Sequence, residues 1–442
     1  MPFSKREQLL ILNLSELLPF SLSLSDEALI LTKGVMRGEI PIESLLLELQ
    51  QDFTSIQQMH FSKNKNGQIL LMIGPKSALD KEALESTLRE IISLELPNNL
   101  KNSATKKPLI FIPADFFGFP LVGSLYFGVI DRGTNLLQVR PITGCPLNCP
   151  FCSVDEGPAS KSKVRDFIVD PDYLISTYNY ILSEKKLNGA EAHIDGQGEP
   201  MSYPYLVELV QRLWENNNTA VVSLQTDGWF LNEQIIDELS AVKLSRINLS
   251  INAFDSKLAK RLAGRGDYNL EKMLELAEYI LDSNISLLLA PIWIPEINDS
   301  DIELLIKFFS KKKRKNSSYP LFGIQNYEIY SEGRHVKGVK QKDFKLFYKQ
   351  LRELESRYRV QDLVLTPKKF GMYKTKLLPI PMKRNEIVKA KIVLPGRLQN
   401  EVLATARRRL IHVRQVSPPS IGKKIKIRIT RNRHNLFFGV PA

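Results

Sequence analysis

Three cysteines stand within eight residues, and they are all the cysteines of the 442-residue chain. Cys145, Cys149 and Cys152 follow the pattern C-x3-C-x2-C. Thiolates this close together suit one soft-metal centre, and three of them leave one iron of a [4Fe-4S] cluster open to a substrate or cofactor. The alternatives are a zinc site completed by a histidine and a chance cluster, but zinc sites usually take their cysteines from two separated pairs.

Regular elements must hold this loop in place, and strand and helix patterns alternate after it. A hairpin over 125–140 leads into the loop, and helical stretches of 10–17 residues separate the strand patterns that follow. This alternation predicts an α/β fold with a parallel sheet, for which a partial (β/α)6 barrel is the natural closure. The strand patterns lie near residues 190–194, 220–225, 246–251, 286–294 and 322–329.

Polar residues follow the predicted strands at the end where parallel α/β sheets place their active sites. The second strand is followed by Asp195-Gly196-Gln197-Gly198-Glu199-Pro200. Its glycines permit close backbone approach to a ligand, and Glu199 is an acceptor for a cationic amine. Ser250 and Asn252 share one side of the fourth strand, either as ligand contacts or as strand-end polar residues. His193, in the second strand, is predicted to be a core residue, with a role at the substrate inside the barrel as the alternative.

The cysteine loop resembles the signature of radical S-adenosylmethionine (SAM) enzymes, with Phe151 as the aromatic residue before the last cysteine. The resemblance implies that the three cysteines hold a [4Fe-4S] cluster whose open iron binds SAM. It also implies that Gly198, Glu199 and Pro200 match the family's Gly-Gly-Glu-Pro motif, which engages the SAM ammonium. Gln197 replaces the first glycine of that motif. Strand residues at the place of Ser250 and Asn252 often contact the SAM ribose or carboxylate.

The resemblance further implies reductive cleavage of SAM to a 5′-deoxyadenosyl radical, with a ferredoxin or flavodoxin as electron donor. No cysteine lies outside 145–152, so subclasses that need a second cluster or a cysteine methyl carrier do not fit. The chain as a whole resembles an uncharacterised family of archaeal Fe-S oxidoreductases. That resemblance supplies neither a substrate nor a catalytic residue.

Positive charge is concentrated at the end of the chain. From Lys374 onward there are 17 Lys and Arg against 2 Asp and Glu, whereas the whole chain carries +13. Short strand patterns over 387–440 predict a small barrel at 376–442, which resembles a TRAM or OB-like RNA-binding domain. Strand alternation places Lys424, Lys426 and Arg428 on one face and isoleucines on the other. RNA phosphates, above all those of transfer RNA, are the expected partner, with a membrane or an acidic protein as alternatives.

The rest of the chain carries no further catalytic motif. The pattern over residues 1–120 predicts an α+β module with helices over 5–18 and 78–94 and a hairpin over 60–73. Residues 121–375 are expected to form the core domain. No apolar run approaches the roughly 18 residues of a membrane-spanning helix. Three clustered cysteines cannot form a disulfide framework, so a reducing cytoplasm is expected.

The predicted function is radical SAM modification of a nucleoside in RNA, most simply transfer RNA. One alternative keeps the radical chemistry but acts on a protein or a small molecule. Another is a non-catalytic Fe-S protein that binds RNA. The charge of the terminal module favours the first of these, because a module that repels itself so strongly needs an anionic partner.

Overall fold

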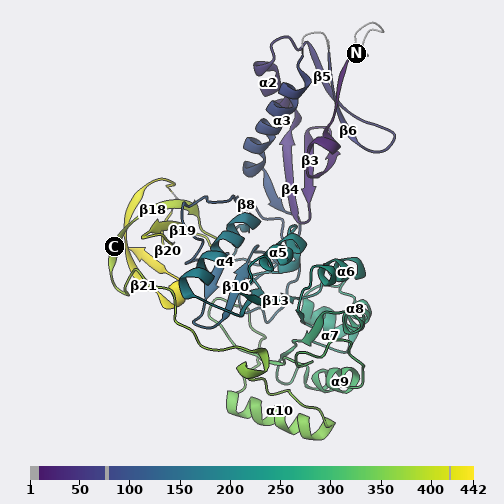
Figure 1. Ribbon diagram of the computed structural model, residues 1–442, viewed down its shortest axis with the longest axis vertical. Coiled ribbons are helices and arrows are strands. Elements are labelled where there is room, and N and C mark those ends of the chain that lie inside the picture. The colour runs from purple at the N-terminus through teal and green to yellow at the C-terminus, as the bar shows by residue number, and fades with distance from the viewer. Residues whose placement is uncertain (1–8, 75–78, 418–419) are drawn as a thin grey trace. The chain divides into compact units, whose positions relative to one another are not determined.

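The computed structural model describes residues 9–74, 79–417 and 420–442. The chain divides into two compact units, Met1–Phe111 and Ile112–Ala442. The first boundary lies near the one predicted at residue 120. The second unit contains both the cysteine loop and the terminal strands (Figure 1). Within the described residues, no helix has the length and apolar character needed to cross a membrane.

The first unit is α+β, with two antiparallel sheets of three and four strands ordered β1-β6-β5 and β2-β3-β4-β7. The predicted hairpin and the second helix are confirmed, and Asp80 caps that helix through the backbone N–H groups of Glu82 and Ala83. The elements are β1 (Leu10–Asn13), α1 (Leu14–Leu17), β2 (Ser21–Leu24), β3 (Ala28–Lys33), β4 (Met36–Pro41), α2 (Ile42–Asp52), β5 (Gln58–Lys63), β6 (Ile69–Gly74), α3 (Lys81–Glu95) and β7 (Leu100–Asn102).

The predicted helix over 5–18 is wrong over Leu10–Asn13, and of its described residues only Leu14–Leu17 are helical, as the short helix α1. Residues 5–8 lie outside the described residues, and Leu10–Asn13 forms strand β1 against β6. Leu10 and Leu12 are buried while Ile11 is 49% exposed, which is the alternation of a strand. Over so few residues, the leucine-rich pattern fits both the helical period of about 3.6 residues and the strand period of about 2. Pairing with β6 selects the strand.

The second unit is built on a six-stranded sheet ordered β15-β14-β13-β12-β10-β9. Every pairing from β10 to β15 is parallel, and β9 joins β10 in the predicted antiparallel hairpin. Leu289 forms a parallel bridge with Phe322, and β16 pairs in parallel with β17. The strands are β9 (Gly128–Asp131), β10 (Leu136–Arg140), β12 (Ala190–Ile194), β13 (Thr219–Thr226), β14 (Arg246–Leu249), β15 (Ser286–Leu289), β16 (Ile292–Trp293) and β17 (Gln325–Asn326).

Helices connect the parallel strands and cover the sheet (Figure 1). Helix α4 packs on β9 and β10, α5 on β13, and α8 on β15. The strands between them are buried along almost their whole length, as expected for a sheet covered by crossover helices. The helices are α4 (Pro171–Lys185), α5 (Leu206–Leu213), α6 (Glu233–Ala241), α7 (Ser256–Ala263), α8 (Leu270–Asp282), α9 (Asp299–Phe309) and α10 (Phe344–Tyr358).

The terminal strands close into a small barrel ordered β18-β19-β20-β22-β21, so the predicted five-stranded barrel is confirmed. Isoleucines of β21 turn inward, with Ile427 and Ile429 fully buried, while Lys424, Lys426 and Arg428 are exposed. The barrel core also contains Phe437. The strands are β18 (Ile387–Pro395), β19 (Glu401–Ala406), β20 (Arg409–Arg414), β21 (Lys424–Arg431) and β22 (Phe438–Pro441).

Candidate active site

The cysteine loop follows β10 and lines a cavity of about 420 Å³ at the carboxyl ends of the parallel strands. Backbone N–H groups already point at two of the sulfurs, because Leu147 donates to Cys145 Sγ (3.4 Å) and Glu156 to Cys152 Sγ (3.3 Å). All nine residues predicted to bind metal or cofactor line this one cavity. They are Cys145, Cys149, Phe151, Cys152, Gly198, Glu199, Pro200, Ser250 and Asn252.

The cavity is acidic. Burial raises the pKa of the thiols of Cys145 and Cys149, and the nearby Asp227 raises both further. No lysine or arginine is among the described residues that line the cavity. The site therefore lacks positive charge and suits a cationic ligand. In the described part of the chain, no three His, Cys, Asp or Glu side chains are gathered as ligands of a single metal ion.

Two carboxyls, the buried Glu199 and the half-buried Asp227, connect the loops after β12 and β13. Glu199 accepts hydrogen bonds from the Thr226 hydroxyl (2.7 Å) and from the backbone N–H groups of Asp227 (2.6 Å) and Met201 (2.8 Å). Asp227 in turn accepts from Cys145 Sγ (3.2 Å). Burial raises the pKa of both carboxyls, and the charge of Asp227 adds to the effect on Glu199. Glu199 thus fixes the loop that carries Asp227 beside the first cysteine.

Gly198 allows the loop after β12 to touch the start of the cysteine loop. It forms a parallel bridge with Gly144 and has a φ of +143°. A Cβ at Gly198 would lie 2.2 Å from the carbonyl oxygen of Gly144. The predicted close backbone approach is therefore between two loops of the protein itself.

We expect Gly198→Ala to destabilise the second unit by about 3 kcal/mol or more, because backbone strain and collision add. Gly189→Ala is the matched control, since Gly189 also has positive φ (+74°) but no atom within 4 Å of its Cβ position. It should lose only about 1–2 kcal/mol. Denaturant unfolding of the full chain measures both, and equal losses would contradict the collision.

Ser250 and Asn252 are both in the cavity wall, but the protein already uses part of each side chain. Ser250 Oγ accepts from Gln225 Nε2 (3.2 Å). Asn252 Oδ1 accepts from the backbone N–H of Ile292 (2.9 Å), which fixes the start of β16. The amide nitrogen of Asn252 and the hydroxyl hydrogen of Ser250 are the groups left for a ligand.

His193 lines the cavity and is not only a core residue. Its Nδ1 lies 2.7 Å from Ser223 Oγ, and that hydroxyl donates to Glu191 Oε1 (2.6 Å). Nδ1 must therefore carry the proton that it shares with Ser223, which leaves Nε2 as an acceptor. Burial lowers the pKa of His193, so the ring is neutral at pH 7. A strand position two residues before Asp195 was the only sequence signal for this role.

Sequence reasoning missed helix α7, whose residues Ala259, Leu262 and Ala263 line the same cavity. The carbonyl of Ala263 accepts from the backbone N–H of Asn148 (2.9 Å), inside the cysteine loop. Two local signals were available. Asp255 caps the start of the helix and Gly264 ends it in the left-handed conformation.

The small barrel contributes Arg397, which is fully buried beneath the cysteine loop. Its guanidinium forms a two-pronged ion pair with Glu156 and a second ion pair with Asp166 (2.9 Å). It also donates to the carbonyl of Gln197 (3.3 Å). The backbone N–H of Glu156 is the donor to Cys152 Sγ, so Arg397 holds both the cysteine loop and the glycine loop.

Comparison with known proteins places this site in a family. The chain is 43% identical over 380 residues to the uncharacterized protein MJ0103 of Methanocaldococcus jannaschii, covering 82% of this chain and 86% of that one. The profile described as the radical SAM superfamily matches residues 139–309, which contain all three cysteines. This chain belongs to the radical SAM superfamily. Radical SAM enzymes use a [4Fe-4S] cluster and SAM, so these are its cofactors, and they generally take electrons from ferredoxin or flavodoxin.

More distant radical SAM similarities cover smaller parts of the chain. The GTP 3′,8-cyclase of Microcystis aeruginosa is 22% identical over 200 residues. The matched residues make up 44% of this chain and 59% of that relative. The structure of TYW1 with a lysine-pyruvate adduct is similar with a TM-score of 0.35 and 18% identity, over 51% of this chain and 74% of that one.

Proposed function

We propose that this radical SAM enzyme modifies a nucleoside in RNA, most simply transfer RNA, and that Cys145, Cys149 and Cys152 hold its cluster. The parallel sheet is, on this proposal, the (β/α)6 partial barrel of the superfamily. The donor set suits the cofactors, because three thiols and two carboxyls without a described lining lysine or arginine call for cationic ligands. When bound and reduced, the cluster supplies one electron to SAM, giving methionine and a 5′-deoxyadenosyl radical that takes a hydrogen atom from the substrate.

The protein's own residues orient and enclose these cofactors. Glu199 and Asp227 offer acceptors to the SAM ammonium, with Gly198 and Pro200 shaping the loop around it. Ser250 and Asn252 bind the ribose or carboxylate through their remaining donors. Phe151, only 5% exposed, lines the cavity beside the last cysteine and excludes water from that part of the wall.

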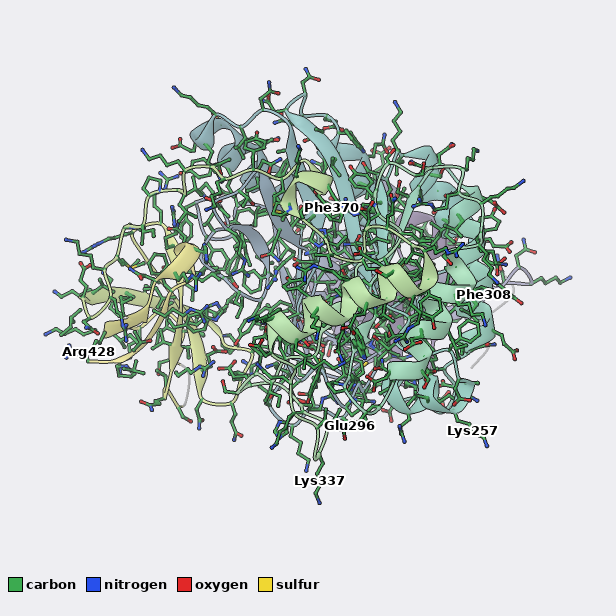
Figure 2. All side chains as sticks on the ribbon, turned by 90° about the horizontal axis from the view of Figure 1, so that it is seen from below. Lys257, Glu296, Phe308, Lys337, Phe370 and Arg428 are labelled. Atoms are coloured by element: carbon green, nitrogen blue, oxygen red, sulfur yellow. The ribbon has the colours of Figure 1, made fainter. Side chains whose placement is uncertain are left out.

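The observation that carries the RNA assignment is a ladder of opposed lysines on the small barrel. In the antiparallel pair β18–β21, Lys389 faces Lys426 and Lys391 faces Lys424. All four side chains are exposed. Like charges directly opposite each other destabilise a sheet, so an anion that bridges them stabilises this face. We call these four residues the lysine ladder. Arg428, labelled in Figure 2, points outward from the same barrel.

The RNA backbone is the anion that such a ladder fits, because its phosphates recur at regular spacing along a strand. The ladder is also free of exposed aromatic rings. Ile387 and Ile421 are the large exposed apolar side chains among the described residues of β18, β21 and the turn before β21. These two strands therefore offer contacts to phosphates and no exposed ring on which a base could stack, which supports a TRAM-like role in holding transfer RNA.

We expect the ladder to set the salt dependence of RNA binding. Replacing all four lysines by glutamine should reduce the slope of log Kd against log salt concentration by up to about 3. The control replaces four exposed lysines on the helices of the same unit and should leave the slope unchanged. These are Lys257, Lys260, Lys272 and Lys307.

The decisive experiment incubates the anaerobic, reduced holoenzyme with SAM and bulk transfer RNA from cells that lack the protein. Nucleoside mass spectrometry should show a mass change in one nucleoside, which the ladder variant produces more slowly at physiological salt. An unchanged nucleoside profile alongside active SAM cleavage would direct the search to a protein or small-molecule substrate. Absence of SAM cleavage would favour a non-catalytic RNA-binding protein.

A further inference from the structure

Three exposed aromatic rings surround a second cavity of the second unit. Tyr330, Phe344 and Tyr348 are 49%, 44% and 38% exposed and line a cavity of about 390 Å³. Proteins rarely expose large apolar side chains together unless the surface binds something. The rings therefore mark a binding site.

This second cavity adjoins the one that holds the cysteines. Phe151, Ser153, Ile292 and Gln325 line both cavities. Phe151 is the residue directly before Cys152, and Gln325 begins the last parallel strand, β17. A molecule held between the exposed rings consequently lies next to the chamber in which, on the proposed function, the hydrogen atom is taken.

The exposed rings are held by an aromatic layer behind them. Phe344 and Tyr348 lie one helical turn apart on α10, with ring centroids 6.1 Å apart and planes tilted by 34°. Phe347 packs against both, and against the buried Trp293 at 6.1 Å. Because this layer fixes the two outer rings, their free faces form a preorganised wall for a flat ligand.

The rim of the cavity offers a hydrogen-bond acceptor in Glu328. Asn326 beside it is held by the protein, because its Nδ2 donates to the carbonyl of Lys342 (2.8 Å) and its Oδ1 is buried. Glu328 also lines the cavity and accepts from the Tyr330 hydroxyl. A flat ring whose edge carries N–H donors matches both the aromatic wall and this rim, whereas an apolar side chain matches the wall alone.

We propose that this second cavity, which we call the ring cavity, binds the target nucleobase. The base is unstacked from its RNA and placed between Phe344, Tyr348 and the acceptor rim. This inference rests on the proposed function and names the part of the substrate that the core receives. Enzymes that act on bases take them out of the stack, and RNA-binding proteins hold unstacked bases on aromatic side chains. The lysine ladder holds the backbone and the ring cavity holds the base.

The test compares RNA modification by the Phe344→Ala and Tyr348→Leu variants with that by a Leu346→Ala control. All reactions are anaerobic and contain SAM and bulk transfer RNA. Leu346 lies on the same helix and is 46% exposed, but it does not line the cavity. We expect the KM for RNA to rise roughly tenfold in each ring variant, since base stacking on one ring is of that size. SAM cleavage without RNA, and thermal unfolding, should match those of the Leu346→Ala protein.

The outcomes separate this inference from the proposed function. Ring variants that modify RNA as well as Leu346→Ala does would overturn the nucleobase site while leaving the proposed function intact. Wild-type protein that cleaves SAM but never alters RNA would overturn the proposed substrate. If wild-type protein then modifies a peptide mixture, and the ring variants do not, the cavity binds a protein side chain and the nucleobase assignment is wrong.

Discussion

Serine at any one of the three cysteine positions is expected to abolish SAM cleavage by the reduced, reconstituted enzyme. Cys145, Cys149 and Cys152 line one cavity, and the sequence contains no other cysteine. A hydroxyl is a harder and far less acidic ligand than a thiol, and no further cysteine is present to replace the lost one. The measurements are bound iron per chain and 5′-deoxyadenosine formed from SAM under dithionite.

Wild-type protein without reductant is the control for this experiment, because it retains the cluster but should form no 5′-deoxyadenosine. The cluster assignment predicts that each variant loses the SAM-dependent change in the electron paramagnetic resonance spectrum. Full iron content and full SAM cleavage in any single variant would show that this cysteine is not a ligand.

Arg397→Met is expected to cost about 3–5 kcal/mol of unfolding free energy. It removes a fully buried cation and leaves Glu156 and Asp166 buried without their counter-charge. The loop that carries Cys152 should loosen as well, because Glu156 N–H donates to that sulfur. Denaturant unfolding of the full chain measures the stability, and iron retention during dilution measures the effect on the cysteine loop.

Arg407→Met is the matched control, since Arg407 belongs to the same small barrel and pairs with Glu386 at its surface. An exposed ion pair of this kind contributes about 1 kcal/mol or less. The triple variant Arg397→Met, Glu156→Gln, Asp166→Asn should recover part of the lost stability, because it removes the stranded charges too. If Arg397→Met and Arg407→Met lose the same stability, Arg397 does not brace the loop.

Features that depend on neighbouring residues could be predicted from the sequence. The cysteine spacing, the glycine loop ending in Glu199, and the alternation of Lys424 and Lys426 with isoleucines are such features. Each needs only a short window, because side-chain direction in a strand and thiol proximity in a tight loop are local properties. The parallel strands ending in polar residues then brought the predicted binding residues to one cavity.

Features that depend on partners far along the chain could not be predicted. Arg397 lies 241 residues from Glu156, and nothing in its own surroundings distinguishes it from other arginines of a basic segment. The same holds for Leu10–Asn13, whose pairing with β6 decides between helix and strand. The exposed rings of α10 follow an ordinary amphipathic pattern, and only packing shows that they border a cavity.

The position of Arg397 also limits how the protein can be divided. A chain that ended before residue 376 would lack the guanidinium that neutralises Glu156 and Asp166. Such a truncated enzyme would lose the support of its cysteine loop, so deletion of the barrel cannot test the proposed RNA binding alone. By the same reasoning, a fusion protein in which another domain replaced the terminal barrel would keep a stable cysteine loop only if the new domain placed an arginine between Glu156 and Asp166.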